Sequence, residues 1–174
     1  GLYNDSVTWW ENTAGDGTAW TGHGIDTAFN EVRCVVSADV DGDGDTDVLG
    51  AAAADDDIAW WENTAGDGSA WLKHTIDASF TGAYAVAAVD VDGDGDMDVA
   101  GAANTAGLIS WWENTAGDAT AWAEHTVDAT FPAARSVAAA DMDGDGDVDL
   151  VGASYTDDDV AWWENTAGEG TAWT

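Results

Sequence analysis

Three short segments of this chain concentrate aspartate at alternating positions. The first reads Asp39-Val40-Asp41-Gly42-Asp43-Gly44-Asp45-Thr46-Asp47, and its pattern recurs at 90–98 and 141–149. If such a segment curls, the carboxylates at its first, third and fifth positions can converge on one point, and glycine at the sixth position permits the sharp turn. Calcium is a hard cation that takes six to eight oxygen ligands. These Asp–Gly loops therefore predict about three calcium sites, one per loop.

Other occupants of the loops fit less well. No cysteine or paired histidine lies nearby, as zinc or copper would require. Magnesium usually keeps several waters and is not given a cage this rich in carboxylates. An acidic turn without metal is the remaining alternative, but five carboxylates within nine residues repel one another strongly unless a cation is present. We expect calcium in a structural role, clamping the strand before each loop to the strand after it.

The ligand set follows from comparing the loop with an EF-hand. Its start matches, but the twelfth position, where an EF-hand needs a bidentate Glu, is glycine in all three copies, and a strand-like run follows. We expect the ninth position to supply the closing carboxylate. The seventh would supply a backbone carbonyl while its side chain faces solvent. The candidate metal-binding residues are Asp39, Asp41, Asp43, Asp45, Asp47, Asp90, Asp92, Asp94, Asp96, Asp98, Asp141, Asp143, Asp145, Asp147 and Asp149.

Internal repetition governs the elements that must position these loops. The string Trp-Trp-Glu-Asn-Thr-Ala-Gly starts at Trp9, Trp60, Trp111 and Trp162, always 51 residues apart, and the Asp–Gly loops keep the same period. Each unit holds four short runs with strand-forming residues, separated by glycine and aspartate turns, and none has a sustained helical period. A constant period indicates units that bury their faces against their neighbours. Four strands per unit of this length is typical of a β-propeller blade.

The sequence thus predicts an all-β fold: a single β-propeller repeat domain, 1–174, of four-stranded antiparallel blades. A partial blade with the last two strands spans 1–29, full blades span 30–80 and 81–131, and a blade without its last strand spans 132–174. This amounts to about three blades with incomplete blades at both ends, whereas a closed propeller needs four to eight. Either the chain is part of a longer one, or copies associate into a ring or fibre through open edges.

The tryptophans and histidines belong to the repeat. Adjacent strand residues point to opposite faces, so one Trp of each pair should pack toward each neighbouring blade. The histidines recur on the fourth strand of each unit, and the single cysteine, Cys34, aligns with Ala and Ser. Both patterns favour packing over catalysis. A third tryptophan per unit is a candidate for stacking on a sugar ring, alongside hydroxyl contacts from Glu62 and Asn63; these candidate ligand-binding residues are Trp71, Trp122 and Trp20.

The loop Asp-x-Asp-Gly-Asp-Gly-x-x-Asp between short strands, followed by Trp-Trp-Glu-Asn, resembles the FG-GAP or VCBS repeat. The resemblance covers essentially the whole chain. Integrin α-subunit propellers and some propeller lectins carry the same type of loop. The resemblance implies calcium bound between the first two strands of each blade, an extracellular location, and adhesion, ligand binding or carbohydrate binding. The Phe-Gly and Gly-Ala-Pro signatures that name the family are incomplete here: Phe29 lacks a following Gly, and Gly50-Ala51 lacks the Pro.

Charge narrows the range of partners. The chain carries 35 acidic and 3 basic residues, so nucleic acid and anionic membrane surfaces, which need cationic side chains, are disfavoured. No apolar run is long enough to insert into a membrane, and the first residues lack the basic start and apolar stretch of a signal peptide. The acidity beyond the loops is typical of either a protein from a salty environment or an ordinary secreted protein.

Three functional hypotheses are considered for this sequence. The leading one is a non-catalytic extracellular module, stiffened by calcium, that binds a glycan or protein ligand or mediates adhesion. The alternative is a structural subunit that forms rings or fibres with other copies of itself. Catalysis is not expected, because the histidines repeat identically in every unit and no nucleophile elbow, phosphate loop or zinc motif is present.

Overall fold

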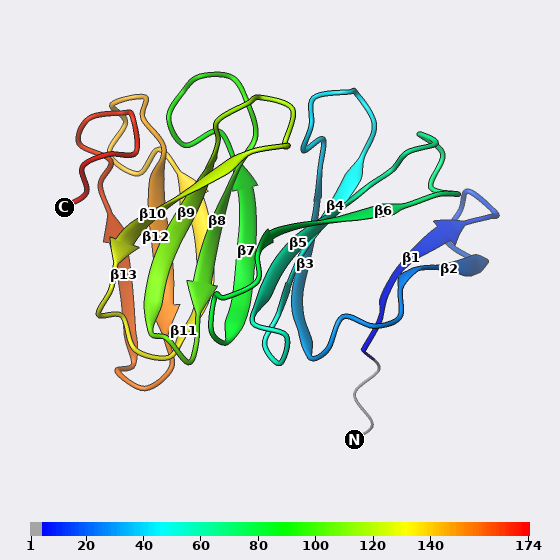
Figure 1. Ribbon diagram of the computed structural model, residues 1–174, viewed down its shortest axis with the longest axis horizontal. Coiled ribbons are helices and arrows are strands. Elements are labelled where there is room, and N and C mark those ends of the chain that lie inside the picture. Colours follow the sequence, from blue (N-terminus) through cyan, green and yellow to red (C-terminus); the bar gives the residue numbers. More distant parts are fainter. Residues whose placement is uncertain (1–4) are drawn as a thin grey trace.

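The computed structural model describes residues 5–174, so the first four residues of the expected partial blade 1–29 lie outside the described residues. Residues 5–174 form thirteen strands and no helix, hence none long and apolar enough to cross a membrane. The strands build four antiparallel sheets that follow one another in chain order across the molecule (Figure 1). The expected all-β fold of propeller-type blades is confirmed.

The first sheet has two strands and the next two sheets have four each. The first pairs β1 (Val7–Asn12) with β2 (Trp20–Asp26). The second follows the order β3 (Val32–Ala38), β4 (Asp47–Ala52), β5 (Asp57–Glu62), β6 (Leu72–Asp77). The third follows the order β7 (Ala83–Val89), β8 (Asp98–Ala103), β9 (Leu108–Asn114), β10 (Trp122–Asp128).

The fourth sheet has three strands, in the order β11 (Ala134–Ala140), β12 (Asp149–Ser154), β13 (Asp159–Trp163). After β13 the chain makes a single further bridge, between Asn165 and Trp173. All described pairings join consecutive strands through hairpins, and the first strands pack side by side, with β7 between β3 and β11. Alanine-rich sequences such as Ala83-Tyr84-Ala85-Val86-Ala87-Ala88 suit these strands because small side chains let them approach closely.

The paired tryptophans join neighbouring sheets, as expected. Trp60 and Trp61 are both buried. Trp60 packs in a cluster with Phe80 and Val86 of the following sheet and its connection. Trp61 points the opposite way and meets the ring of Phe29 edge-on, with centroids 4.9 Å apart. Each interior sheet is therefore covered on one face by its predecessor and on the other by its successor.

The histidines have a packing role, as their repetition predicts. His74 stacks on Trp60 with ring centroids 4.5 Å apart, and its Nε2 lies 2.8 Å from Glu62 Oε2. The units at His23 and His125 repeat both contacts. Cys34, at a position expected to favour small packing residues, is half-buried against the same core cluster as Trp60.

Glycine on the second strand makes room for the second tryptophan of each pair. A Cβ built at Gly101 would lie 2.7 Å from Trp112 Cζ3, closer than non-bonded carbons approach. We therefore expect Gly101→Ala to lower the free energy of unfolding by about 1–3 kcal/mol through overpacking. Chemical denaturation with tryptophan fluorescence as the signal measures this.

Gly24→Ala in β2 is the matched control, because nothing lies within 4 Å of a Cβ at that site. Its free energy of unfolding should stay within about 0.5 kcal/mol of the parent value. Equal losses in the two variants would contradict the proposed packing role of Gly101.

Candidate metal centre

Each Asp–Gly loop connects the first strand of a sheet to the second, as the sequence predicts. The loops lie between β3 and β4, between β7 and β8, and between β11 and β12. Gly42 and Gly44 both adopt positive φ, at 76° and 95°, a region that residues with a Cβ rarely enter. These glycines let the chain fold back on itself so that successive aspartates face a common point.

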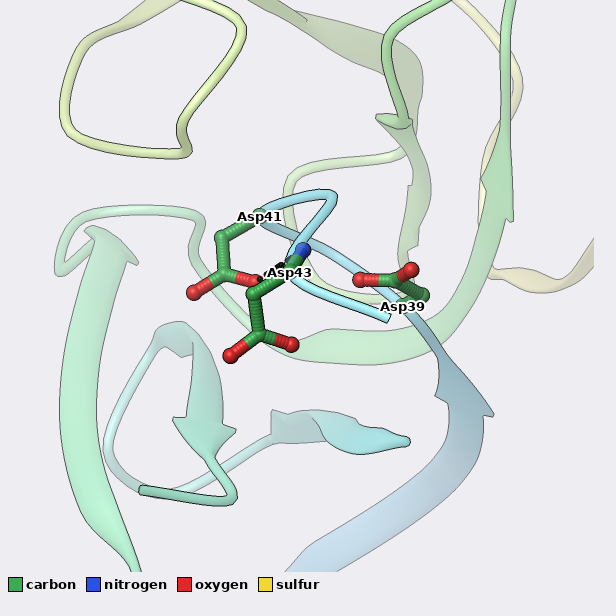
Figure 2. A group of neighbouring side chains, drawn as sticks. All are labelled: Asp39, Asp41 and Asp43. Carbon is green, nitrogen blue, oxygen red and sulfur yellow. Dashed lines mark hydrogen bonds between the residues drawn. The ribbon is translucent and has the colours of Figure 1, made fainter. Parts of the chain in front are cut away.

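Three aspartates converge in each loop. In the first loop, carboxylate oxygens of Asp39, Asp41 and Asp43 all lie within 4.8 Å of one another (Figure 2). The second loop repeats this with Asp90, Asp92 and Asp94, and the third loop groups Asp141, Asp143 and Asp149. The expected convergence at positions one, three and five thus occurs in the first two loops. In the third loop, the ninth position joins the first and third.

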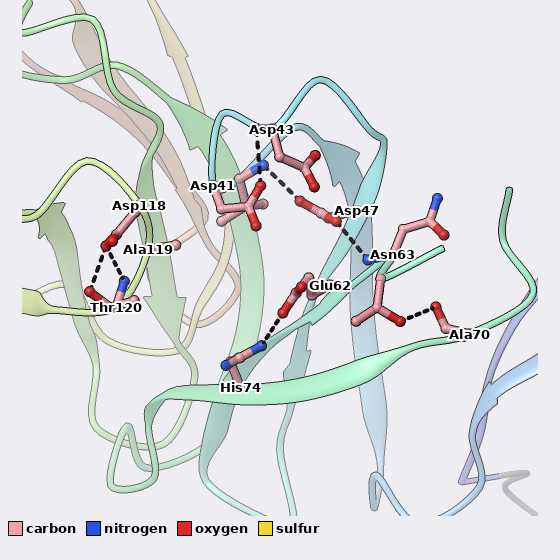
Figure 3. Close-up of polar contacts among 12 residues, drawn as sticks. Asp41, Asp43, Asp47, Glu62, Asn63, Ala70, His74, Asp118, Ala119 and Thr120 are labelled. Carbon is pink, nitrogen blue, oxygen red and sulfur yellow. Dashed lines mark hydrogen bonds and ion pairs between the residues drawn. The ribbon is translucent and has the colours of Figure 1, made fainter. Parts of the chain in front are cut away.

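The ninth aspartate also has a separate structural role. Asp47 is buried, and its two oxygens accept hydrogen bonds from Val40 N at 3.0 Å and Asn63 N at 2.9 Å (Figure 3). Asp98 and Asp149 repeat the same pair of contacts. This carboxylate ties the loop to the end of the third strand, and each of its oxygens keeps a lone pair for a further partner.

The expectation that the seventh aspartate faces solvent is wrong. Asp45 is half-buried, and its carboxylate covers Gly66 in the turn after β5; a Cβ built at Gly66 would lie 2.5 Å from Asp45 Oδ2. The same contact occurs between Asp96 and Gly117, and between Asp147 and Gly168. The physical reason is that the turn after the third strand folds over the loop, which sequence spacing alone does not reveal.

The hydrogen bonding of Asp39 tests most directly whether a cation fits the first Asp–Gly loop. Its Oδ2 accepts a hydrogen bond from Gly44 N at 3.0 Å, whereas its Oδ1 is buried and has no hydrogen-bond partner. A buried carboxylate oxygen without a partner is costly unless a positive charge compensates it. All-oxygen donors at this spacing match a hard cation. The residues present therefore fit calcium.

The chain's own cations do not compensate the loops, because all three have partners elsewhere. Lys73 pairs with Asp57 at 2.8 Å, Arg33 pairs with Glu31 at 2.7 Å, and Arg135 lies over the ring of Tyr155. The loop carboxylates consequently face one another without a counter-charge from the described residues. Burial raises the pKa of Asp98 to about 6, against hydrogen bonds from Asn114 N and Val91 N that act to lower it.

A series of hydrogen bonds connects the first loop to the preceding sheet, and the third loop repeats it, whereas Trp60 Nε1 in the equivalent place at the second loop has no hydrogen-bond partner. The buried Asn63, which Asp47 holds through its backbone, accepts a hydrogen bond at Oδ1 from Gly68 N, 2.9 Å away. Gly68 O in turn accepts a hydrogen bond from Trp9 Nε1 of the first sheet at 3.2 Å. Asn63, expected as a possible sugar contact, therefore also has a structural role inside the protein. The five-residue spacing from Asn63 to Gly68, which recurs from Asn165 to Gly170 and has Ala119 in place of glycine after Asn114, is the signal that could have revealed it.

The three candidate ligand-binding tryptophans differ in their exposure to solvent. Trp71 and Trp122 are half-buried, Trp20 is exposed, and the indole N–H of each donates to a nearby backbone carbonyl. Trp71 and Trp9 line a cavity of about 280 Å³ between the first two sheets. Asp67 lies at the same cavity, whereas Asn63, also in its wall, has its amide bonded within the protein. The structure thus brings one of the three candidates into a cavity together with a second indole.

A model of the FG-GAP-like repeat matches the chain twice, over residues 39–101 and 90–152. The chain belongs to the FG-GAP-like repeat family. Each match begins at one Asp–Gly loop and ends in the strand that follows the next Asp–Gly loop. It therefore contains the aspartate cluster, the paired tryptophans and the turn that covers the loop.

A lectin is among the solved structures that share the fold of this FG-GAP-like chain. It is an Agrocybe aegerita lectin, described as specifically recognising non-reducing terminal N-acetylglucosamine. The sequence identity is 20% and the TM-score is 0.60, with 98% of this chain and 45% of the lectin covered. The chain therefore spans less than half the length of that lectin. No curated protein gave a significant match.

The pKa of Asp98 leads to a pH dependence of the metal-free protein. Its folded value of about 6 lies above the ordinary 3.8 of an unfolded chain, so the folded state binds more protons between these two values. The free energy of unfolding should therefore fall as pH rises from about 4 through 6 and level off above. Melting temperatures in a chelator across this range measure the effect.

The Asp98→Asn variant distinguishes the titration of Asp98 from that of the other carboxyl groups. It should melt at a lower temperature, because an amide cannot accept both N–H groups, and its pH profile should be flatter. A metal-free parent protein as stable at pH 7 as at about pH 4.5 would contradict the argument.

Proposed function

We propose that this FG-GAP-like chain is a non-catalytic, ligand-binding propeller segment whose Asp–Gly loops bind calcium as a structural cofactor. The observation that carries the proposal is the buried Asp39 Oδ1, which has no partner and lies beside the carboxylates of Asp41 and Asp43. The other two loops repeat the three-aspartate cluster. When bound, the cation supplies the positive charge that these clusters lack.

The residues of each loop would hold the cation while linking it to the rest of the blade. The carboxylates at the first, third and fifth positions face one point, and the ninth adds its oxygens in the third loop. Asp47 secures the loop to Asn63, and Asn63 positions the turn that accepts the Trp9 hydrogen bond. An ordered loop thereby supports the contact between neighbouring blades.

An extracellular location is part of this proposal. Calcium-binding modules outside cells work with dissociation constants of about 10⁻⁴–10⁻³ M, so the proposed sites would need only modest affinity there. The strongly acidic surface of the chain is compatible with secretion. Adhesion or ligand binding, rather than catalysis, is the function that a repeated and rigid platform of blades supports.

Isothermal titration calorimetry tests the metal proposal. We expect about three calcium ions per chain, one for each converging cluster, and a rise in melting temperature of the size that ligand linkage predicts. At a hundredfold excess over the dissociation constant, each site adds about 2.7 kcal/mol to the free energy of unfolding. Magnesium should compete weakly, since it dehydrates reluctantly.

Asp90→Asn should remove one site, because Asp90 belongs to a converging cluster. Asp157→Asn removes the same charge at an exposed position outside the loops and is the matched control, which should leave the number of sites unchanged. A folded protein that takes up no calcium at millimolar concentration would overturn the proposal.

A carbohydrate is the ligand that the cavity between the first two sheets best supports. Trp9 and Trp71 offer apolar indole surface, and the exposed Asp67 offers carboxylate oxygens. Sugar rings have an apolar face that stacks on aromatic rings and hydroxyls that hydrogen-bond to carboxylates. The fold shared with the Agrocybe aegerita lectin agrees with this proposal.

A glycan array, followed by titration with N-acetylglucosamine in saturating calcium, tests the carbohydrate proposal. Trp71→Ala should weaken any binding by about two- to tenfold, since a stacked aromatic contributes on the order of 0.5–1.5 kcal/mol. Trp20→Ala and Trp122→Ala distinguish the other two candidates, and Leu72→Ala, an exposed neighbour on β6, serves as the control. Binding of no glycan at any calcium concentration would refute this ligand class while leaving the metal proposal intact.

A further inference from the structure

Asn165 contacts two of the candidate metal centres at once. Its backbone N–H donates a hydrogen bond to Asp149 Oδ1 at 2.9 Å, and Asp149 is one of the three converging aspartates of the third Asp–Gly loop. Its side-chain Nδ2 donates to the carbonyl oxygen of Val91, 3.1 Å away in the second loop. Asn165 is fully buried, so water does not compete for these contacts.

The contact with Val91 lies in the middle of the second aspartate cluster. Val91 separates Asp90 from Asp92, two of the three aspartates that converge in the second loop. Its own N–H donates to Asp98 Oδ2 at 2.9 Å. A fixed Val91 peptide therefore limits the movement of the carboxylates on either side of it. The third loop, Asn165 and the second loop form one continuous series of hydrogen bonds between the third and fourth sheets.

The corresponding series between the second and first loops is interrupted. Asn114 occupies the same repeat position as Asn165, and its backbone N–H donates to Asp98 Oδ1 at 2.8 Å. Its side-chain Nδ2, however, is buried and has no hydrogen-bond partner among the described residues. It therefore makes no hydrogen bond to Val40, the counterpart of Val91 in the first loop. Asn114 does not join the second loop to the first.

A glycine in the turn after the third strand accompanies the intact series. Gly68 and Gly170 occupy the same repeat position, and the carbonyl of each accepts the indole N–H of a tryptophan in the preceding sheet at 3.2 Å. A Cβ built at Gly68 would lie 2.8 Å from Trp9 Cζ2, and one built at Gly170 would lie closer still to Trp111. These turns approach the preceding sheet only because they carry no side chain there.

Ala119 stands at that position in the third sheet and carries such a Cβ. It lies beside the first Asp–Gly loop (Figure 3), packs in the same buried cluster as Val40 and Trp60, and adopts a φ of 56°. The indole N–H of Trp60 has no hydrogen-bond partner. Ala119 N is bonded to Asn114 Oδ1 at 3.0 Å. A turn that stays away from the preceding sheet thus also holds Asn114 short of Val40.

We propose that Asn165 is a positioning residue that couples calcium binding in the second and third loops, whereas the first loop binds calcium independently. This inference rests on the proposed calcium-binding function. Asp149, once fixed by an ion in the third loop, holds Asn165 and the Val91 carbonyl in place, so the second loop is partly ordered before it binds its own ion. Because linkage is reciprocal, an ion in the second loop favours binding in the third to the same extent.

Calcium titrations of two variants that each keep two loops test this coupling. Asp39→Asn leaves the second and third clusters intact, and Asp141→Asn leaves the first and second. The Asp39→Asn variant should bind two ions cooperatively, the second at least about fivefold more tightly than independent sites would allow. The Asp141→Asn variant should bind its two ions without cooperativity. Isothermal titration calorimetry measures both.

Two further substitutions assign the coupling to the named residues. Asn165→Ala, added to the Asp39→Asn variant, should abolish the cooperativity, whereas Asn114→Ala removes the matching amide in the same variant and should leave it unchanged. Ala119→Gly, added to the Asp141→Asn variant, should create cooperativity between the first and second loops. The reason is that glycine lets Trp60 and Asn114 complete the hydrogen bonds that their counterparts make. A misfolded variant cannot produce such a gain.

The outcomes separate this inference from the function on which it rests. Two ions bound independently by the Asp39→Asn variant, or cooperativity that survives Asn165→Ala, would overturn the coupling and leave calcium as a structural cofactor. No calcium uptake by the parent chain overturns the proposed function and the coupling together. If Asn165→Ala has no cooperative melting transition and is therefore unfolded, Ala119→Gly decides: two sites that stay independent after this substitution overturn the inference.

Discussion

The packing of paired tryptophans between neighbouring sheets is the interaction on which the rest of this structure depends. A four-stranded sheet has two faces, and in the interior of this row both are apolar, so neither can be left in water. Trp60 and Trp61 point to opposite faces and reach the following and preceding sheets. Glycine opposite the second tryptophan and alanine on the first strand provide the space these large rings need. Each unit is therefore stable only through its neighbours.

The Asp–Gly loops oppose that stability and are at the same time tied to it. Their converging carboxylates repel one another, and in the first loop the buried Asp39 Oδ1 has no hydrogen-bond partner among the described residues. The first loop is joined to the interface between sheets through Asp47, Asn63 and the turn that accepts the Trp9 indole. A cation that neutralises a loop would thus act on the contact between two sheets as well as on the hairpin that carries it.

Much of the architecture could be predicted because each unit repeats the same local signals. Four short runs between glycine and aspartate turns predicted the four strands, and the observed sheets follow that order. The convergence of Asp39, Asp41 and Asp43 also followed from local geometry, since residues two apart on a curled loop face one side. The position of Asp45 did not, because its surroundings depend on a turn some twenty residues away that folds over the loop.

The sequence by itself determined the period, the strand order and the clustering of carboxylates, since all three arise from neighbouring residues within one unit. Only the tertiary structure decided which side of each unit is covered. Trp10 and Trp61 belong to the same repeat position, yet one is exposed and the other buried. It likewise placed Asn63 in a buried hydrogen-bond series. The physical reason is that burial is a property of a residue together with its neighbours in space, and identical units acquire different neighbours at the ends of a row.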